Sequence, residues 1–405
     1  MRTTSKLLIL STAALLGLVG CSSSGDEDSA PAADSAPAEQ SSAHPRLVLT
    51  HDGGLTVLSA TDLSTVASFD YDGFIRANPA GDGRHAFVST SEGFELLDLG
   101  TWREPHDGHA HYYTAAPTRT DISYPGAKPG HVVPHDGTTT LFTDGTGAVW
   151  ILDTAKLGSP EALTREFAVP AHHGVAVTRE DGTVVVSEPV DEKAGALRIL
   201  DAGGKQIAQY DGCPGLHGEA AAADGALTFG CTDGALLVRG NEIVKVAAAD
   251  PYARLGNQAG SEHSPIVLTD YKIDKEADLE RPKKFALLDT VGAGAIRVVD
   301  IDYSYSFRSL GRGPAGEAVL LGTDGAVHVI DPVTGAEKAG YPVIDAWVEP
   351  DEWQAPSPDL FVLGSTAYVT DPAKKKVIAI SLHDGTTLAE KALDQPTVEL
   401  TGVTG

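Results

Sequence analysis

The sequence predicts an all-β fold, a β-propeller with eight blades. From residue 46 onward it shows no amphipathic helical pattern, and short alternating runs such as Arg46–Thr50 and His85–Thr90 dominate instead. Asp-Gly dipeptides occur twelve times between these runs. Both positions of this dipeptide tolerate the positive φ angles of tight hairpins. Many short strands joined by hairpins are typical of an all-β protein.

A repeated strand ending supports the propeller. A pair of aliphatic residues followed by Asp, Ser or Arg recurs eight times, about 46 residues apart on average. A unit of this length holds four strands with their turns, which is the period of a propeller blade. The recurrences are Val57–Ser59, Leu96–Asp98, Ile151–Asp153, Ile199–Asp201, Leu237–Arg239, Val298–Asp300, Val329–Asp331 and Ala379–Ser381. Seven blades are the nearest alternative, and a β-sandwich is disfavoured at this length.

The two ends of residues 46–405 predict that this single propeller domain closes on itself. No strand precedes Arg46–Thr50, and Thr397–Thr401 is a lone strand at the end of the chain. We expect the last strand to complete the first blade, because a closed ring leaves no open sheet edge.

Composition excludes several classes of function. The chain has 405 residues, with 30 Lys and Arg against 56 Asp and Glu, for a net charge of −26. Such an acidic chain is not expected to bind nucleic acid. An apolar content of 42% is too high for a wholly disordered chain. The single methionine is the initiator, so thioether ligation of a metal is excluded. We expect a monomer.

The N-terminus is expected to direct export rather than to join the fold. Arg2 and Lys6 precede a short apolar run over 7–19, which is typical of a signal peptide over 1–20. Leu18-Val19-Gly20-Cys21 resembles a bacterial lipobox, so we expect cleavage before Cys21 and lipidation of this residue. Residues 21–45 have little apolar bulk and are expected to form a disordered tether between membrane and domain. An ordinary secreted protein is the alternative.

Cys213 and Cys231 are the two cysteines that follow the lipobox. In an exported domain without other thiols they are expected to form a disulfide. A pair of thiolate metal ligands is the alternative.

Four histidines recur at close to the blade period, namely His131, His173, His217 and His263. Each follows a turn and precedes an expected strand. Equivalent positions in successive blades face the same end of the central channel. We therefore predict a Zn²⁺ site there, because Zn²⁺ accepts imidazole nitrogens in a tetrahedron.

Four rings spread over half a ring of blades cannot all reach one ion easily. His131, His173 and His217 are therefore the main candidates and His263 the weaker one. A structural hydrogen bond within the blade is the alternative for each of them. Further groups near in sequence are Asp136 and Glu219, as carboxylates that complete the ligand shell, and His135 and His172, as outer or alternative ligands.

A second cluster places His106, His109 and His111 within six residues, next to Asp107. The spacing of His109 and His111 puts both side chains on one side of an extended segment, so they form a chelating pair. Gly and Pro in this segment favour a mobile loop that captures or hands over an ion. Surface histidines without a function are the alternative.

These motifs together resemble the exported zinc metallochaperones of the AztD type. The resemblance runs from about residue 50 to the C-terminus and is densest over 104–231. It is carried by Gly-His-Ala-His-Tyr-Tyr (108–113), Lys-Pro-Gly-His-Val-Val-Pro-His (128–135), His-His-Gly-Val-Ala (172–176) and Cys-Pro-Gly-Leu-His-Gly-Glu (213–219). It implies a propeller with a central zinc site, a further His-rich site near a flexible segment, and zinc delivery to the solute-binding protein of a zinc ABC importer. The His-rich run is short here, with three histidines.

The resulting hypothesis is a cell-surface zinc-binding protein that is not an enzyme. Imidazole also suits Cu²⁺ and Ni²⁺, so ligand type does not settle the metal. One alternative is a zinc-dependent hydrolase or lactonase-like propeller with Glu219 as general base, although neither a Gly-x-Ser-x-Gly nor a His-Glu-x-x-His motif occurs. The other is an interaction scaffold without metal.

Overall fold

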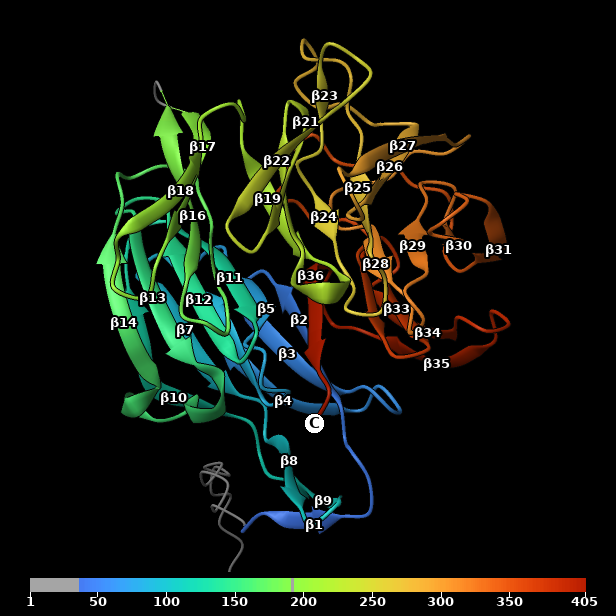
Figure 1. Ribbon diagram of the computed structural model, residues 1–405. Helices are drawn as coiled ribbons and strands as arrows, with labels where there is room; N and C mark the ends of the chain where they lie inside the picture. Colours follow the sequence, from blue (N-terminus) through green and yellow to red (C-terminus); the bar gives the residue numbers. More distant parts are fainter. Residues whose placement is uncertain (1–35, 191–192) are drawn as a thin grey trace, which may run out of the picture. The chain divides into compact units, whose positions relative to one another are not determined.

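Nearly all regular structure in the computed structural model, which describes residues 36–190 and 193–405, is β-strand. The expected signal peptide, Cys21 and most of the expected tether lie outside the described residues. Eight sheets with four strands in line follow one another along the chain, each built from antiparallel neighbours (Figure 1). These sheets are called blades 1 to 8 below, and they confirm the expected propeller fold.

Blades 1 to 4 occupy the first half of the described chain. Blade 1 is β36 (Thr397–Val403), β2 (Arg46–His51), β3 (Gly54–Ser59) and β4 (Thr65–Asp70). Blade 2 is β5 (Arg76–Pro79), β6 (His85–Ser89), β7 (Gly93–Asp98) and β10 (Thr118–Pro125). Blade 3 is β11 (Pro129–His135), β12 (Thr138–Thr143), β13 (Ala148–Asp153) and β14 (Leu163–Ala168). Blade 4 is β15 (Ala176–Thr178), β16 (Val184–Val190), β17 (Lys193–Leu200) and β18 (Gln206–Tyr210).

Blades 5 to 8 complete the series. Blade 5 is β19 (His217–Ala221), β20 (Leu227–Cys231), β21 (Asp233–Arg239) and β22 (Glu242–Ala247), with β23 (Ala253–Arg254) beside β21. Blade 6 is β24 (Gln258–Ala259), β25 (Ile266–Asp270), β26 (Lys284–Asp289) and β27 (Ala295–Asp300). Blade 7 is β28 (Leu310–Arg312), β29 (Ala318–Leu321), β30 (Ala326–Ile330) and β31 (Glu337–Pro342). Blade 8 is β32 (Leu360–Leu363), β33 (Thr366–Asp371), β34 (Lys376–Ser381) and β35 (Thr387–Ala392). Three short 3₁₀ turns are η1 (Thr154–Lys156), η2 (Pro160–Ala162) and η3 (Ala223–Gly225).

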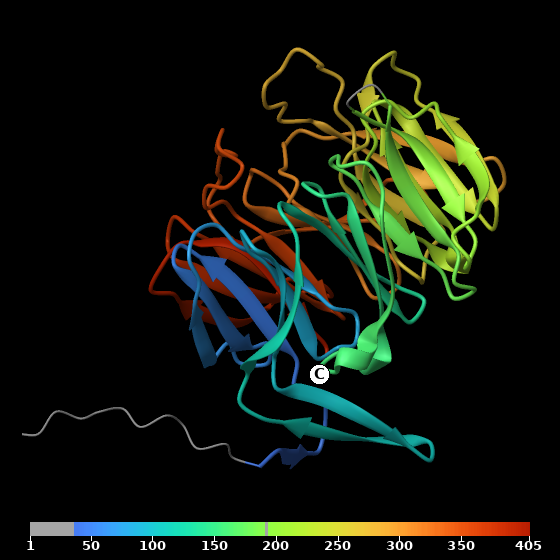
Figure 2. The same cartoon turned by 90° about the vertical axis from the view of Figure 1, so that its left-hand side faces the viewer.

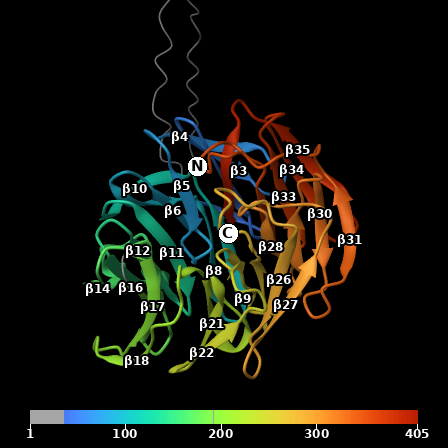
Figure 3. The ribbon, with the colours of Figure 1, turned by 90° about the horizontal axis from the view of Figure 1, so that it is seen from above.

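The C-terminal strand completes blade 1. β36 pairs antiparallel with β2, with Val48 opposite Thr401, and so supplies the inner strand that the N-terminal side lacks. Apolar side chains of blade 1 also pack against blade 8, where Leu47 and Leu49 share a core with Tyr368. The Tyr368 hydroxyl donates to the Ala60 carbonyl at 2.9 Å. The first and last blades therefore join, and the sheets surround one central axis when viewed from above (Figure 3).

Each apolar core forms between two neighbouring blades. Val57 of blade 1 packs with Val88 of blade 2, and Val185 of blade 4 packs with Phe229 of blade 5. Successive side chains of a strand point to opposite faces, so each sheet buries one face against one neighbouring blade and the other face against the next. Each fully buried aliphatic side chain contributes about 1.5–3 kcal/mol. This packing fixes the innermost strands, and the site residues lie on or next to these strands.

The recurring strand ending falls at the third strand of a blade, as in β7 and β13, with one exception to the expectation. In blade 6 the equivalent ending is Leu287–Asp289 in β26, whereas Val298–Asp300 closes the outer strand β27. The two segments read alike because Leu-Leu-Asp and Val-Val-Asp share the same pattern. Pattern alone therefore misplaced this repeat by one strand.

A small three-stranded sheet lies outside the blades, formed by β8 (Thr101–His106), β9 (His109–Thr114) and β1 (Ala38–Gln40). β8 and β9 are a hairpin inserted between β7 and β10 of blade 2, and it lies below the blades in Figure 2. β1 falls within the segment expected to be a disordered tether. It differs from that expectation because the hairpin offers an edge, and Glu39 pairs with Tyr113 of β9.

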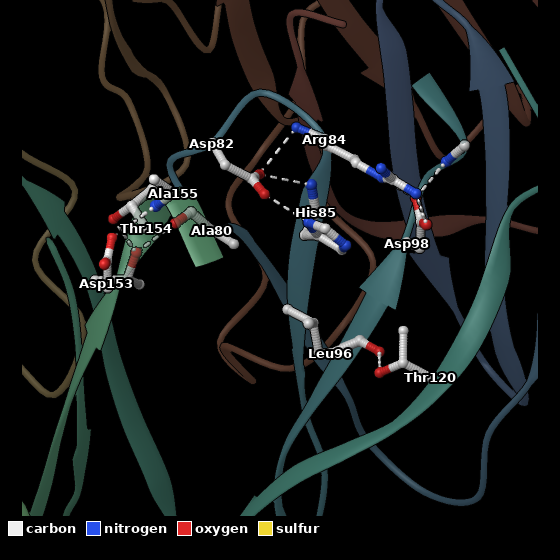
Figure 4. Close-up of polar contacts among 12 residues, drawn as sticks. Ala80, Asp82, Arg84, His85, Leu96, Asp98, Thr120, Asp153, Thr154 and Ala155 are labelled. Carbon is white, nitrogen blue, oxygen red and sulfur yellow. Dashed lines mark hydrogen bonds and ion pairs between the residues drawn. The ribbon is translucent and has the colours of Figure 1, made fainter. Parts of the chain in front are cut away.

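Polar contacts in blade 2 hold the root of this hairpin (Figure 4). Asp82 accepts from the backbone N–H groups of Arg84 and His85 and from Nδ1 of the buried His85 ring. The Arg84 guanidinium donates to Asp98 through Nε at 3.0 Å and Nη2 at 2.5 Å. It also lies 4.2 Å over the ring of Trp102, which stacks on Tyr113. This chain of contacts fixes where β8 and β9 leave the blade.

No helix in the described part of the chain has the length and apolar character that a membrane crossing requires.

Candidate metal sites

The topology brings the start of each first strand to one end of the propeller. Consecutive strands of a blade are antiparallel, so the loop before the first strand and the loop between the second and third strands lie at the same end. His131 lies near the start of β11, His217 is the first residue of β19, and His173 lies in the loop before β15. Asp144 lies between β12 and β13. The side chains of these residues therefore meet at one opening of the central channel.

His131, His173 and His217 form a triangle, as the sequence predicted for the main candidates. Their ring centroids lie 5.9 Å apart for His131 and His173, 6.2 Å for His131 and His217, and 4.8 Å for His173 and His217. A Zn–N bond is about 2.0–2.1 Å long. His131, His173 and His217 are not among the described groups whose ligand atoms all lie within 4.8 Å of one another, so their side chains would have to turn to hold a single ion. We call these three residues the central triad.

An oxygen lies against Nδ1 of every ring in the central triad. Nδ1 of His131 lies 3.0 Å from Oε2 of Glu219, and Nδ1 of His173 lies 2.5 Å from Oδ2 of Asp144. Nδ1 of His217 donates to the Gly256 carbonyl at 2.6 Å. In the neutral ring, an acceptor at Nδ1 holds the proton there and leaves Nε2 able to bind a metal. Such outer contacts orient the imidazoles of metal sites in proteins.

Charge around the triad acts differently on its members. Burial lowers the pKa of His131, but the Glu219 carboxylate, with a smaller contribution from Asp144, holds this pKa above its usual value. Burial and the charges of His131 and Arg254 lower the pKa of His217 to about 3. His217 is therefore neutral at physiological pH, which is the form that binds a metal.

Glycines beside the histidines leave room for these contacts. A Cβ on Gly130 would lie 2.4 Å from Oδ1 of Asp144, the carboxylate that holds His173. Gly218 has a φ of +73°, and a Cβ there would lie 2.2 Å from the Gly256 carbonyl oxygen that accepts from His217. The Gly-His and His-Gly pairs of the sequence thus reflect close packing around the triad.

The triad opens into a cavity of about 1200 Å³ along the channel. The cavity is far larger than a metal ion, and its lining includes the three rings together with Asp144 and Glu219. Three imidazoles on a tetrahedral Zn²⁺ would leave one position for a fourth ligand. Arg76, Arg254 and Lys272 line the same space.

The other expected ligands lie elsewhere or are already bonded. Asp136 contacts His135, with Nε2 of His135 3.0 Å from Oδ2 of Asp136, at the opposite end of β11 from His131. Both nitrogens of the buried His172 are engaged, by the Pro170 carbonyl at 2.7 Å and the Ser187 hydroxyl at 2.9 Å. His263 is exposed and is not among the residues that line the cavity. The structure thus brings together three of the four periodic histidines.

Asp144 was not predicted from the sequence. It stands in an Asp-Gly turn like eleven others, so its role as the acceptor for His173 was hidden among turn residues. Asp144 lies between β12 and β13, at the same end of the propeller as the loop that carries His173. A count of the strands would have identified this position.

The expected disulfide is present between Cys213 and Cys231, with Cα atoms 5.0 Å apart. Cys213 lies four residues before His217, and Cys231 ends β20, the strand that pairs with β19. The bond therefore ties the segment that leads into His217 to the body of blade 5.

His106, His109 and His111 form a second candidate site, and one ligand atom from each lies within 4.8 Å of the others. His106 and His109 are directly paired across the hairpin, and Nε2 of His109 lies 3.2 Å from Nε2 of His111. The i, i+2 relationship of His109 and His111 is as expected, with ring centroids 4.9 Å apart. We call these three residues the hairpin triad.

The expected loop at 106–111 is wrong, because the segment is a β-hairpin. Asp107 and Gly108 have φ angles of +41° and +85° and form its two-residue turn. The Asp-Gly pair favours this geometry, which preorganises the histidines on paired strands. Glu39 of β1 adds a carboxylate, with Oε1 2.7 Å from Nδ1 of His111.

The two triads lie at opposite ends of the blades. The central triad lies at the starts of first strands or in the loop before one, whereas the hairpin joins the third and fourth strands of blade 2. In a sheet of antiparallel strands these connections emerge at opposite ends. A direct passage of an ion from one triad to the other would have to cross the length of the channel.

Comparison with known proteins agrees with the resemblance found in the sequence. No family model matches the chain. The zinc chaperone AztD of Citrobacter koseri is 26% identical to it over 339 residues, which cover 80% of this chain and 78% of that protein. The resemblance to AztD predicted from the motifs is confirmed.

Solved structures share the fold. The crystal structure of Citrobacter koseri AztD matches with a TM-score of 0.79 and 24% identity over 90% of this chain and 99% of that one. The structure of apo AztD from Citrobacter koseri matches with a TM-score of 0.76 and 25% identity over the same shares. The dihydro-heme d1 dehydrogenase NirN in complex with DHE matches at 0.55 with 12% identity, over 88% of this chain and 74% of that one, so this likeness concerns the fold alone.

Proposed function

We propose that this chain is an extracytoplasmic zinc chaperone that holds one Zn²⁺ at the central triad. The observation that carries the proposal is the set of oxygens at Nδ1 of His131, His173 and His217, which leaves three Nε2 atoms as ligands. The likeness to a protein named as a zinc chaperone supports zinc as the cargo. The chain binds and transfers the ion rather than catalysing a reaction.

Release requires a site that binds tightly and yet opens. The triad opens into a cavity of about 1200 Å³, so an incoming group can bind before any imidazole leaves. Histidine or carboxylate groups of the receiving protein would then displace the imidazoles one at a time. His173 is the first to leave in this scheme, because its side chain is 55% exposed whereas that of His131 is 20% exposed.

We place a second exchangeable ion at the hairpin triad. These rings are exposed or half-buried, and a site in this setting captures ions from solution faster than an enclosed one. Glu39 orients His111 through Nδ1, so the segment that precedes the propeller shares in this site. We place His263 outside both sites.

The receiving partner we propose is the solute-binding protein of a zinc ABC importer. The lipobox at Leu18–Cys21 supports anchoring by lipidated Cys21 at the outer side of the cell membrane. The tether would then keep the propeller close to an importer in the same membrane.

Zinc titration by competition with a chromogenic chelator tests the proposal. Wild type is expected to bind two ions, with His131→Ala and His217→Ala each removing the tighter one. His109→Ala/His111→Ala is expected to remove the other ion alone, and His263→Ala neither. Wild type with no ion bound under competition would overturn the proposal.

A zinc-dependent hydrolase is the second candidate, since three imidazoles with an open position are also a catalytic arrangement. Glu219 would have to serve as general base, but it lies against His131. A panel of esters and lactones decides between the two functions: zinc-dependent turnover lost in Glu219→Gln would favour the enzyme.

A further inference from the structure

Cationic side chains stand beside a site that is proposed to bind a cation. Arg254 and Lys272 are partly buried in the lining of the central cavity and form no ion pair with any residue that the structure describes. Cationic groups that are partly buried in a cavity and have no ion pair can donate to an anionic ligand.

Arg254 lies directly beside the central triad. Gly256 accepts the hydrogen bond of His217 Nδ1, and a Cβ placed on Gly256 would lie 2.7 Å from Nε of Arg254. The guanidinium thus folds over the backbone group that holds His217. Arg76 lines the cavity on the opposite side of the triad and bonds Glu399 through Nε at 2.8 Å.

The acidic groups of the cavity have other partners or lie beyond ion-pair distance of Arg254 and Lys272. Asp144 and Glu219 lie against the rings of His173 and His131, and Asp351 accepts from Arg281 at 2.7 Å. Asp72 is exposed. Burial raises the pKa of Glu349 and of the nearby Asp270, while the charge of Lys272 lowers both pKa values and that of Arg254 lowers the pKa of Asp270. The cavity therefore keeps cationic donors for a ligand of opposite charge.

We propose that the cavity binds a carboxylate together with zinc. One carboxylate oxygen takes the open fourth position of an ion held by the central triad, and Arg254 donates to the second oxygen. Lys272 adds its charge from the same wall. The inference rests on the proposed function, and it names the group that starts transfer. The carboxylate comes either from a free carboxylic acid or from an Asp or Glu side chain of the receiving protein.

Physical chemistry gives Arg254 two opposite effects. Its positive charge weakens the binding of a bare divalent ion by repulsion. The same charge strengthens binding once a carboxylate lies between the guanidinium and the ion, since a guanidinium matches the geometry of a carboxylate. Zinc would thus be held less firmly alone and more firmly in the mixed complex with a carboxylate, and ligand exchange would start from this complex.

The test uses the full chain with His109→Ala/His111→Ala, so that only the central triad binds metal, and Co²⁺ as a visible probe. Acetate is titrated in one arm. The peptide acetyl-Gly-Glu-Gly-amide is titrated in a second arm, with acetyl-Gly-Gln-Gly-amide as its control. Each Co²⁺ spectrum is recorded for this protein and for the same protein that also carries Arg254→Gln. Arg297→Gln is the matched control, because Arg297 is an exposed residue on the outer strand of blade 6.

Acetate or the Glu peptide is expected to change the Co²⁺ bands saturably, and the Gln peptide is not. Arg254→Gln is expected to lower the affinity for the carboxylate at least tenfold. It is expected to raise the affinity for Co²⁺ without a carboxylate by roughly two- to tenfold. Arg297→Gln changes neither. Stronger binding of the Glu peptide than of acetate identifies a protein side chain as the source, and equal binding identifies a free acid.

Unchanged Co²⁺ spectra in both carboxylate arms would overturn this inference while leaving zinc binding in place. Failure of Co²⁺ and Zn²⁺ to bind at all would instead overturn the proposed function. If Arg254→Gln does not fold, the difference between the Glu and Gln peptides on the unaltered cavity still decides the matter.

Discussion

Nδ1 of His131 in blade 3 lies 3.0 Å from Oε2 of Glu219 in blade 5, so one contact joins two blades that are not neighbours. Blade 4 follows blade 3 and precedes blade 5 along the chain, and the loop before its first strand contributes His173. The contact orients His131 and at the same time fixes the spacing of the two blades at the site.

Glu219→Gln is therefore expected to weaken zinc binding at the central triad by about 10- to 100-fold, the usual cost of losing a carboxylate behind a ligating histidine. Chelator competition measures the change. Asp136→Asn is the matched control, because Asp136 lies against His135 at the other end of β11, and it should bind zinc as wild type does. Equal affinity in Glu219→Gln and wild type would refute the orienting role.

Zinc affinity at the central triad is expected to fall as the pH drops, starting above the pH at which free imidazole takes up its proton. Binding requires Nε2 without a proton, and the pKa of His131 is raised by Glu219. Affinity is thus complete above the raised pKa and is lost as the pH falls through it. In Glu219→Gln the onset should move to lower pH, and competition assays between about pH 5 and 8 would show this shift. An onset that does not move would contradict the assignment.

The fold could be predicted from the sequence because its signals are periodic. Strand endings repeat with the blade, and the lone strands at 46–50 and 397–401 predict the closure that the β2–β36 pair forms. The convergence of His131, His173 and His217 could be predicted for the same reason, while their binding of zinc stays a prediction. Asp144 and Gly256 could not, since their contacts depend on loop conformations that carry no period.

The segment of the hairpin triad was expected to be a loop, and this prediction is wrong. Gly and Pro near His106 indicated a loop, yet the Asp107-Gly108 pair is itself a hairpin signal. Partnership with β1 could not be read from the sequence, because three residues in a polar segment form a strand only when an edge such as β9 is available.

Gly130→Ala is expected to weaken zinc binding about tenfold while the propeller still folds. The added Cβ would meet Oδ1 of Asp144 at 2.4 Å and push this carboxylate away from His173. Chelator competition gives the affinity, and circular dichroism checks the fold. Gly203→Ala serves as the control, since its Cβ would meet only Oδ1 of Asp201, at 3.3 Å. Equal loss in both variants would mean that the effect is not local to Asp144.

Removal of the disulfide should affect stability and zinc binding together. In Cys213→Ser/Cys231→Ser the free energy of unfolding is expected to fall by about 3 kcal/mol, the chain-entropy value for a bridge that spans 18 residues. Urea denaturation of the zinc-free protein measures this loss. Zinc affinity is expected to fall as well, because the segment from Cys213 to His217 then loses its link to β20 and His217 moves more freely. A loss of stability with unchanged zinc affinity would show that the hydrogen bond from Cys213 N–H to the Gly195 carbonyl, at 3.0 Å, positions this segment without the disulfide.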